Sequence, residues 1–131
     1  MEEKRLFDIL KLYIAKYPSQ EVALAKKESG SWKKYSIQEY IEITNNISYA
    51  LIKLGIKKDD KVGIICNNRP EWNMLDMAIM QVGAITVPIY PTISKEDYHY
   101  IINDCEVKLI VLEGQSVLQK IESVKDESPS E

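Results

Sequence analysis

Residues 62–92, VGIICNNRPEWNMLDMAIMQVGAITVPIYPT, decide the fold. Two apolar runs, 62–66 and 84–90, flank a segment that has proline at its first helical position and glycine at its end, as helices often do. A third apolar run follows at 107–113. Short continuous apolar runs are typical of strands that are buried on both faces of a parallel sheet. We therefore expect three such strands, with helices between them.

The order of elements over residues 61–124 is strand, helix, strand, helix, strand, helix. Right-handed crossovers between parallel strands place helices on both faces of the sheet and leave the carboxyl ends of the strands at one edge, where ligands bind. The exits from the three runs are Asn67–Arg69, Tyr90–Thr92 and Glu113–Gly114. We expect these exits to share one edge.

The preceding residues predict an N-terminal helix (1–18), a β-hairpin (21–36) and a long helix (36–55). The hairpin is expected to turn at Ser29-Gly30. Ser36 and Glu39 form an S-x-x-E capping box that begins the long helix, and Gly55 ends it. Together with the 61–124 unit and a tail over 125–131, these segments predict one domain over 1–131. The expected fold class is α/β, with three layers around a mainly parallel sheet.

Composition excludes several classes of protein. The 131 residues carry a net charge of -3, with 45% hydrophobic and 28% charged residues, as in an ordinary globular domain. The 17 basic residues are scattered, so no nucleic-acid partner is predicted. The N-terminus is amphipathic and interrupted by charges, unlike a secretory signal, and the apolar runs are too short to span a bilayer. We expect a cytoplasmic location, with peripheral membrane association of a longer parent protein left open.

No catalytic residue and no metal site is predicted. The sequence contains neither GxGxxG after a strand nor GxxxxGK[ST], the glycine-rich patterns that bind phosphates. His99 is the only histidine and lies on a predicted helix without a nucleophile motif, which favours a packing role. Cys66 and Cys105 lack the spacing of zinc ligands, and we expect them to be free, buried or half-buried thiols.

Arg69 allows two interpretations. An arginine at the mouth of a parallel sheet can bind phosphate or carboxylate through its planar guanidinium. Alternatively, it forms an ordinary ion pair beside the helix start, with Glu71 or a neighbouring element, and we favour this second interpretation.

Residues 60–113 resemble the N-terminal region of AMP-forming acyl-CoA synthetases, especially the long-chain fatty-acid CoA ligases of the adenylate-forming superfamily. The resemblance extends from Trp32 to about Glu113. Its most specific segments are NRPEW (68–72), GAITVPIYPT (83–92) and YIINDCEVKLIV (100–111).

The resemblance implies a two-step reaction. A fatty acid and ATP give an acyl-adenylate and pyrophosphate, and the thiol of coenzyme A then displaces AMP. The family's phosphate loop, resembling YTSGTTGxPKG, is not among these 131 residues, and neither are its other catalytic motifs. We therefore expect part of an N-terminal subdomain that is inactive alone. ATP, Mg and coenzyme A would serve the full-length parent, with none bound to the fragment.

One site is implied by position. In members similar to acetyl-CoA synthetase, the turn that matches Tyr90-Pro91-Thr92 lies against the adenine end of coenzyme A during thioester formation. Those members have a Phe-Gly-Gly type of turn. This sequence keeps an aromatic residue at Tyr90, which could stack on adenine, but proline and threonine replace the glycines and put close backbone approach in doubt.

Two alternatives remain. The chain could be a free-standing α/β binding or interaction module, or part of an adenylate-forming enzyme for a different acid. The expected partners are fatty acid, ATP and coenzyme A in the parent, and the remainder of the same polypeptide. Apolar faces that would meet that remainder favour self-association of the isolated chain.

Overall fold

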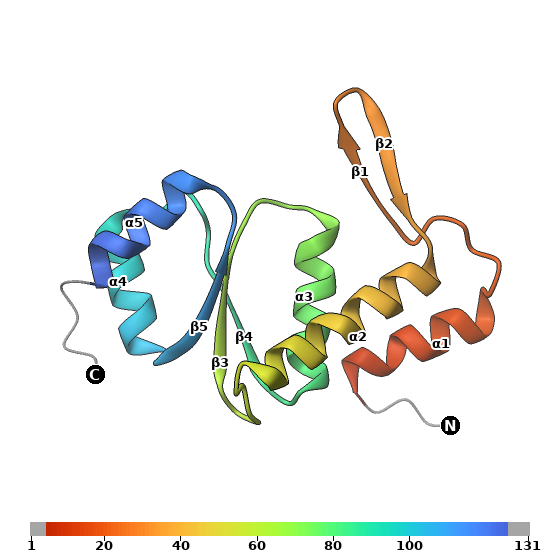
Figure 1. Cartoon of the computed structure of the whole chain (residues 1–131), viewed down its shortest axis with the longest axis horizontal. Coiled ribbons are helices and arrows are strands. Elements are labelled where there is room, and N and C mark those ends of the chain that lie inside the picture. The colour runs from red at the N-terminus through yellow and green to blue at the C-terminus, as the bar shows by residue number, and fades with distance from the viewer. Residues whose placement is uncertain (1–4, 126–131) are drawn as a thin grey trace.

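The structure is a computed structural model that describes residues 5–125. Its elements alternate between helices and strands after an N-terminal helix and a hairpin (Figure 1). In chain order they are η1 (Leu6–Asp8), α1 (Ile9–Lys16), β1 (Leu24–Glu28), β2 (Ser31–Tyr35), α2 (Ile37–Lys53), β3 (Lys61–Ile65), α3 (Pro70–Gln81), β4 (Ile85–Pro88), α4 (Lys95–Asp104), β5 (Val107–Leu112) and α5 (Gln115–Lys125).

The central sheet has the order β4-β3-β5, and both strand pairs are parallel. Ile64 at the middle of the sheet pairs with Pro88 of β4 and with Val111 of β5. The predicted parallel arrangement of the three apolar runs is confirmed. Because β3 lies between β4 and β5, the connection from β4 to β5 passes over β3.

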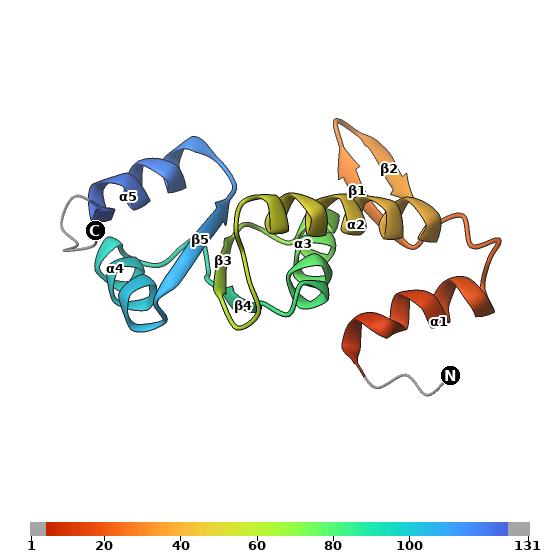
Figure 2. The same ribbon diagram turned by 60° about the horizontal axis from the view of Figure 1, so that its bottom comes forward.

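Helices cover both faces of this sheet. In Figures 1 and 2, α4 and α5 lie on one side of the strands, while α2 and α3 lie on the other. Leu51 of α2 and Ile79 of α3 share a core cluster with Ile64. On the opposite face, Tyr98 of α4 and Val117 of α5 pack with Ile65. The molecule therefore has the predicted three layers.

The apolar helix α3 lies between two cores. Leu75, Ala78 and Ile79 pack toward the sheet, whereas Met74 packs with Leu10 of α1 in a separate cluster. This arrangement explains why the helix is apolar on nearly every side.

Burial on both faces was predicted for all three strands, and this prediction is wrong for two of them. Only β3 is almost completely buried, whereas β4 and β5 each contain half-buried and exposed residues. The physical reason is their position, because both are edge strands of a three-stranded sheet. Pro88 fits β4 for the same reason, since an edge strand can lack one backbone donor.

The N-terminal helix is shorter than predicted. The described chain begins with the 3₁₀ turn η1, and α1 starts only at Ile9 and ends at Lys16, before Pro18. Residues 1–4 of the predicted helix lie outside the described residues, as does the predicted tail except for Lys125.

Local sequence signals begin and end the other elements as expected. Ser29 and Gly30 both have positive φ, 48° and 86°, as a tight two-residue hairpin turn requires. The Glu39 amide donates to Ser36 Oγ at 3.1 Å, and the Ser36 amide donates to the Glu39 carboxylate at 2.7 Å. Gly55, with φ of 84°, follows the end of α2.

Candidate functional site

The carboxyl ends of the three parallel strands meet at the upper edge of the sheet in Figure 1. Backbone pairing continues beyond the strands, because the Ile89 amide donates to Ile64 O and the Glu113 amide donates to Ile65 O, both at 2.9 Å. The Asn67 amide donates to Glu113 Oε2 at 3.0 Å. Hydrogen bonds therefore connect the exits of β3 and β5, as expected for parallel neighbours.

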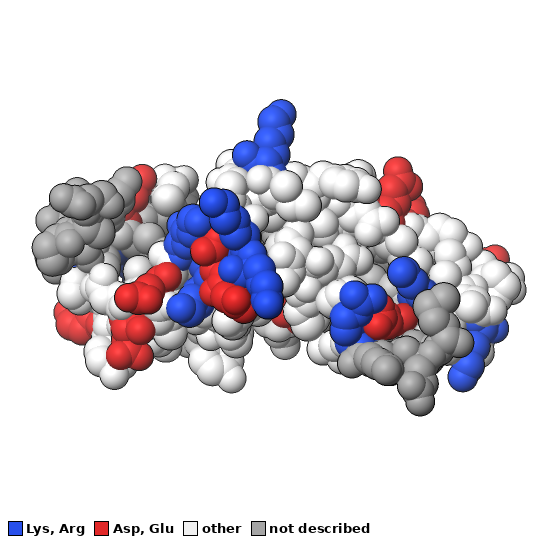
Figure 3. Space-filling view, turned by 90° about the horizontal axis from the view of Figure 1, so that it is seen from below, with Lys and Arg blue, Asp and Glu red and all other residues white. Residues whose placement is uncertain are grey.

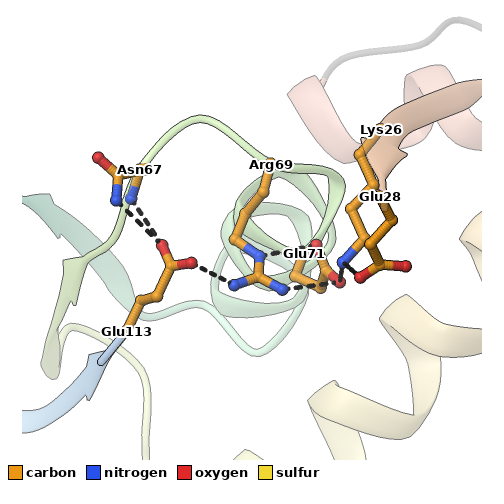
Figure 4. Close-up of polar contacts among 6 residues, drawn as sticks. All are labelled: Lys26, Glu28, Asn67, Arg69, Glu71 and Glu113. Atoms are coloured by element: carbon orange, nitrogen blue, oxygen red, sulfur yellow. Dashed lines mark hydrogen bonds and ion pairs between the residues drawn. The ribbon is translucent and has the colours of Figure 1, made fainter. Parts of the chain in front are cut away.

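Arg69 is the centre of an ion-pair network at this edge (Figure 4). Its Nε donates to Glu71 Oε2 at 2.9 Å, and its Nη1 donates to Glu113 Oε1 at 2.6 Å. Lys26 of the hairpin donates to Glu71 Oε1 at 2.8 Å and also pairs with Glu28. The network joins the hairpin, the start of α3 and the end of β5. The predicted ion pair with Glu71 is confirmed.

The contacts in this network favour the charged forms of Glu71 and Arg69. Hydrogen bonding from Arg69, with a smaller contribution from Lys26, lowers the pKa of Glu71 from its ordinary value of 4.5 to about 2. Hydrogen bonding to Glu71 in turn raises the pKa of Arg69. A guanidinium shared by two carboxylates has few donors left for an anion, so Arg69 acts here as a structural link between elements.

The turn at Tyr90-Pro91-Thr92 leaves the same edge after β4. Tyr90 is 78% exposed, so most of its side chain is open to solvent. Thr92 is also exposed, whereas Pro91 is half-buried. The carbonyl of Tyr90 accepts a hydrogen bond from the hydroxyl of Tyr98, on α4, at 3.1 Å. The side chain of Tyr90 is thus exposed, while its backbone carbonyl is restrained by a hydrogen bond.

A cavity of about 280 Å³ lies between this turn and the turn after β3. It is lined by Cys66, Asn68, Trp72, Pro88, Ile89 and Tyr90. The sequence predicted that both turns share one edge, but it predicted no cavity between them. The sequence indicated that NRPEW and the Tyr90 turn lie at the same edge of the sheet, but not which of their side chains are close together.

Comparisons with known proteins identify the family. The model of the AMP-binding enzyme family matches residues 11–131. This chain belongs to the AMP-binding enzyme family. Among curated relatives, it is 40% identical over 108 residues to the long-chain-fatty-acid–CoA ligase ACSBG2 of Xenopus laevis, which covers 82% of this chain and 15% of that protein. It is 37% identical over 94 residues to fatty acyl-CoA synthetase A of Dictyostelium discoideum, covering 72% of this chain and 14% of that protein.

Solved structures share the fold. The crystal structure of the anthranilate CoA ligase AuaEII in complex with anthranoyl-AMP superposes with a TM-score of 0.81 at 25% identity. The match covers 96% of this chain and 23% of that chain. The present chain thus spans about 15% of the length of the curated AMP-binding enzymes it matches.

The structure of this AMP-binding enzyme segment also shows the surroundings of His99 and of the two cysteines. The side chain of His99 contacts Asn103 one turn along α4, consistent with the predicted packing role. Cys66 and Cys105 are free and half-buried, and burial raises the pKa of the Cys66 thiol. Within residues 5–125, no group of three or more His, Cys, Asp or Glu side chains is arranged to hold a metal ion. No helix in the same range is long and apolar enough to cross a membrane.

The opposite edge of the sheet carries mixed charges. Lys108 of β5 donates to Asp60 Oδ2 at 2.8 Å, and Lys61 lies 3.9 Å from Glu106. On the face seen in Figure 3, basic and acidic side chains lie together and form no continuous basic surface. Asp60 lies in the turn before β3, where a charge could be fully solvated. Instead it bonds Lys108 and the Lys57 amide, and these bonds lower its pKa.

A second, apolar groove of about 570 Å³ runs between α2, the start of α3 and β5. Leu54 at the end of α2 and Val111 on β5 line it and are 67% and 37% exposed. Arg69 and Glu113 lie at its polar end. The outer edge of β5 has no strand partner among the described residues.

Proposed function

We propose that this chain is the N-terminal part of an ATP-dependent long-chain fatty-acid CoA ligase. In the first step, the fatty-acid carboxylate attacks the α-phosphorus of ATP, forming an acyl-adenylate and releasing pyrophosphate. In the second, the sulfur of coenzyme A attacks the acyl carbon, and AMP leaves with the electron pair of the broken C–O bond. The observation that carries the proposal is the 40% identity with a long-chain fatty-acid ligase over 82% of this chain.

The described residues fit one of the implied ligands and not the others. Tyr90 offers an exposed aromatic face beside a cavity of about 280 Å³, which suits the adenine of coenzyme A. Residues 5–125 offer no carboxylate cluster for Mg, and the turn into α3 contains Arg69 and Pro70 in place of phosphate-binding glycines. We propose that ATP and Mg are held by the remainder of the same polypeptide.

Within the reaction, this chain would bind and orient coenzyme A. We propose that Tyr90 stacks on the adenine, that Pro91 restricts the backbone beside it, and that Thr92 lies at the rim of the contact. The hydrogen bond from the Tyr98 hydroxyl supports this arrangement, because it restrains the backbone carbonyl of Tyr90. None of these residues would touch the reacting carbonyl, so we assign them no catalytic role.

The chain alone is proposed to be inactive. Its 131 residues lack the serine- and glycine-rich phosphate loop, and the remainder of the same polypeptide would supply it. The apolar groove between α2 and β5 would meet that remainder, and in the isolated chain it would favour self-association. A cytoplasmic location is part of the proposal, with contact of the whole enzyme with a membrane surface left open, and nucleic acid is not a proposed partner.

A different acid substrate is the second candidate. The likeness to an anthranilate CoA ligase favours it, because that ligase shares the fold of this segment and is named for an aromatic acid. A free-standing binding module is the remaining alternative. Sequencing the gene beyond the codon for Glu131 separates these possibilities, because a ligase requires the phosphate loop downstream. A stop codon immediately after Glu131 would favour the module.

The coenzyme A contact is tested in the full-length ligase with Tyr90→Ala. We expect a higher KM for coenzyme A, with the ATP–pyrophosphate exchange of the first step largely unchanged. Tyr49→Ala is the matched control, because Tyr49 is 70% exposed on α2. Equal loss in both half-reactions would indicate a folding role for Tyr90 and would overturn the proposed contact.

A further inference from the structure

Tyr98 is a completely buried tyrosine whose hydroxyl faces the exit of β4. Its side chain is 0% exposed and packs with Ile65, Ile89 and Val117 between the sheet and α5. Its hydroxyl donates to the carbonyl of Tyr90 at 3.1 Å. A phenylalanine could fill the same apolar space, but it could not donate this hydrogen bond.

The two residues differ sharply in their environment. Tyr90 is 78% exposed, whereas Tyr98 is buried, eight residues further along the chain. The hydrogen bond thus links the backbone of an exposed aromatic residue to a side chain that is fixed in the core. It also spans the loop between β4 and α4.

The backbone around Tyr90 is held on both sides. On the strand side, the Ile89 amide donates to Ile64 O at 2.9 Å. On the loop side, the Tyr90 carbonyl belongs to the peptide bond that precedes Pro91, whose ring fixes φ and restricts the preceding residue to extended conformations. The bond from Tyr98 fixes the orientation of that peptide plane. These restraints set the direction of the Tyr90 Cα–Cβ bond, from which the ring extends.

We propose that Tyr98 is a positioning residue for coenzyme A, which acts by holding Tyr90 in the orientation that stacks on adenine. The inference rests on the proposed function, since it takes Tyr90 as the contact. It adds a buried residue to the proposed contact. Without the Tyr98 hydroxyl, the Tyr90 peptide group can rotate toward water, and the Cα–Cβ bond of Tyr90 loses its fixed direction relative to the cavity that Asn68 and Trp72 line.

The first test uses the 131-residue chain and Tyr98→Phe. Amide hydrogen exchange is expected to become faster at Ile89, whose amide donates to Ile64 O directly before Tyr90, and to stay unchanged in β3. Tyr100→Phe is the control, because Tyr100 is 67% exposed on the same helix. Unchanged exchange at Ile89, or faster exchange throughout β3, would overturn the positioning role.

The second test uses the full-length ligase. Tyr98→Phe is expected to raise the KM for coenzyme A about fivefold, the effect of losing one net hydrogen bond, while ATP–pyrophosphate exchange stays unchanged. In a Tyr90→Ala background, the same substitution should add no further rise. A rise that remains in that background, or equal loss in both half-reactions, would overturn the inference.

The failures of the two proposals can be distinguished. If Tyr90→Ala raises the KM for coenzyme A but Tyr98→Phe leaves it unchanged, only the positioning role fails. If Tyr90→Ala itself leaves the KM unchanged in a ligase that still forms acyl-CoA, the proposed contact fails, and the role of Tyr98 is overturned with it.

Discussion

Arg69 Nη1 lies 2.6 Å from Glu113 Oε1, although 44 residues separate the two side chains in sequence. Arg69 follows β3, and Glu113 follows β5, so this ion pair joins the exits of neighbouring parallel strands. The Asn67 amide bonds the other oxygen of the same carboxylate. Glu113 therefore contacts the β3 exit at two points. One contact is an ion pair with Arg69, and the other is a hydrogen bond from the Asn67 backbone amide.

Arg69→Met is expected to destabilise the chain by about 1 kcal/mol, because it leaves Glu71 and Glu113 without their shared cation at a partly exposed site. Urea unfolding measures the change in the free energy of unfolding. Lys34→Met is the control, because Lys34 is exposed on the hairpin and should tolerate the same loss of charge. Equal stability of Arg69→Met and Lys34→Met would contradict a structural role for the network.

Glu71 should make the stability of the chain depend on pH in the acid range. Hydrogen bonding from Arg69 lowers the folded-state pKa of Glu71 to about 2, below its ordinary value of 4.5. A depressed pKa stabilises the fold above the unfolded value, and this contribution is lost as the pH falls from 4.5 toward 2. The stability difference between the unmodified chain and Glu71→Gln should therefore shrink over that range.

Chemical unfolding at a series of pH values measures this difference. Glu42→Gln, at an exposed position of α2, controls for the general effect of removing a carboxylate. A difference between the unmodified chain and Glu71→Gln that stayed constant down to a pH of about 2 would contradict the assigned origin of the shift.

Much of the fold could be predicted because its signals are local. The capping box of Ser36 and Glu39 depends on residues three apart, and the hairpin turn needs only Ser29 and Gly30 in positive φ. The change from helical to strand-like periodicity after Gly55 marked the start of the sheet. These features are determined by backbone geometry within a few residues.

The arrangement of the site depended on longer distances. Sequence reasoning expected the strand exits at one edge, and it correctly favoured an ion pair between Arg69 and Glu71. It missed the contact of Lys26 with Glu71, 45 residues apart, because that contact depends on how the hairpin packs against α3. It likewise missed that β4 and β5 are edge strands, since runs of apolar residues do not reveal the order of strands in a sheet.

Gly63→Ala is expected to destabilise the fold by about 1–3 kcal/mol through overpacking. A Cβ at Gly63 would lie 3.3 Å from Val107 Cγ1 and 3.5 Å from Ile110 Cγ1, in the centre of the sheet. Thermal or chemical unfolding measures the cost. Adding Val107→Ala should recover part of it, because this removes the closest atom. Strictly additive effects of the two substitutions would contradict the packing explanation.

The isolated chain is expected to self-associate through the groove between α2 and β5. Leu54→Lys places a charge on this surface and should shift the chain toward monomer in sedimentation velocity measurements. Ile52→Lys is the control, because Ile52 is 57% exposed on the same helix but does not line the groove. A chain that is strictly monomeric at high concentration would contradict this prediction.

The most direct measurement is acyl-CoA formation from a long-chain fatty acid, ATP and coenzyme A by two proteins in parallel. One is the 131-residue chain, and the other is a chimera in which the matching segment of this chain replaces the 108-residue segment of the Xenopus laevis ligase. We predict no turnover by the chain alone and ATP- and coenzyme A-dependent acyl-CoA formation by the chimera. Turnover by the chain alone, or a correctly folded chimera that forms neither acyl-adenylate nor acyl-CoA, would contradict the account.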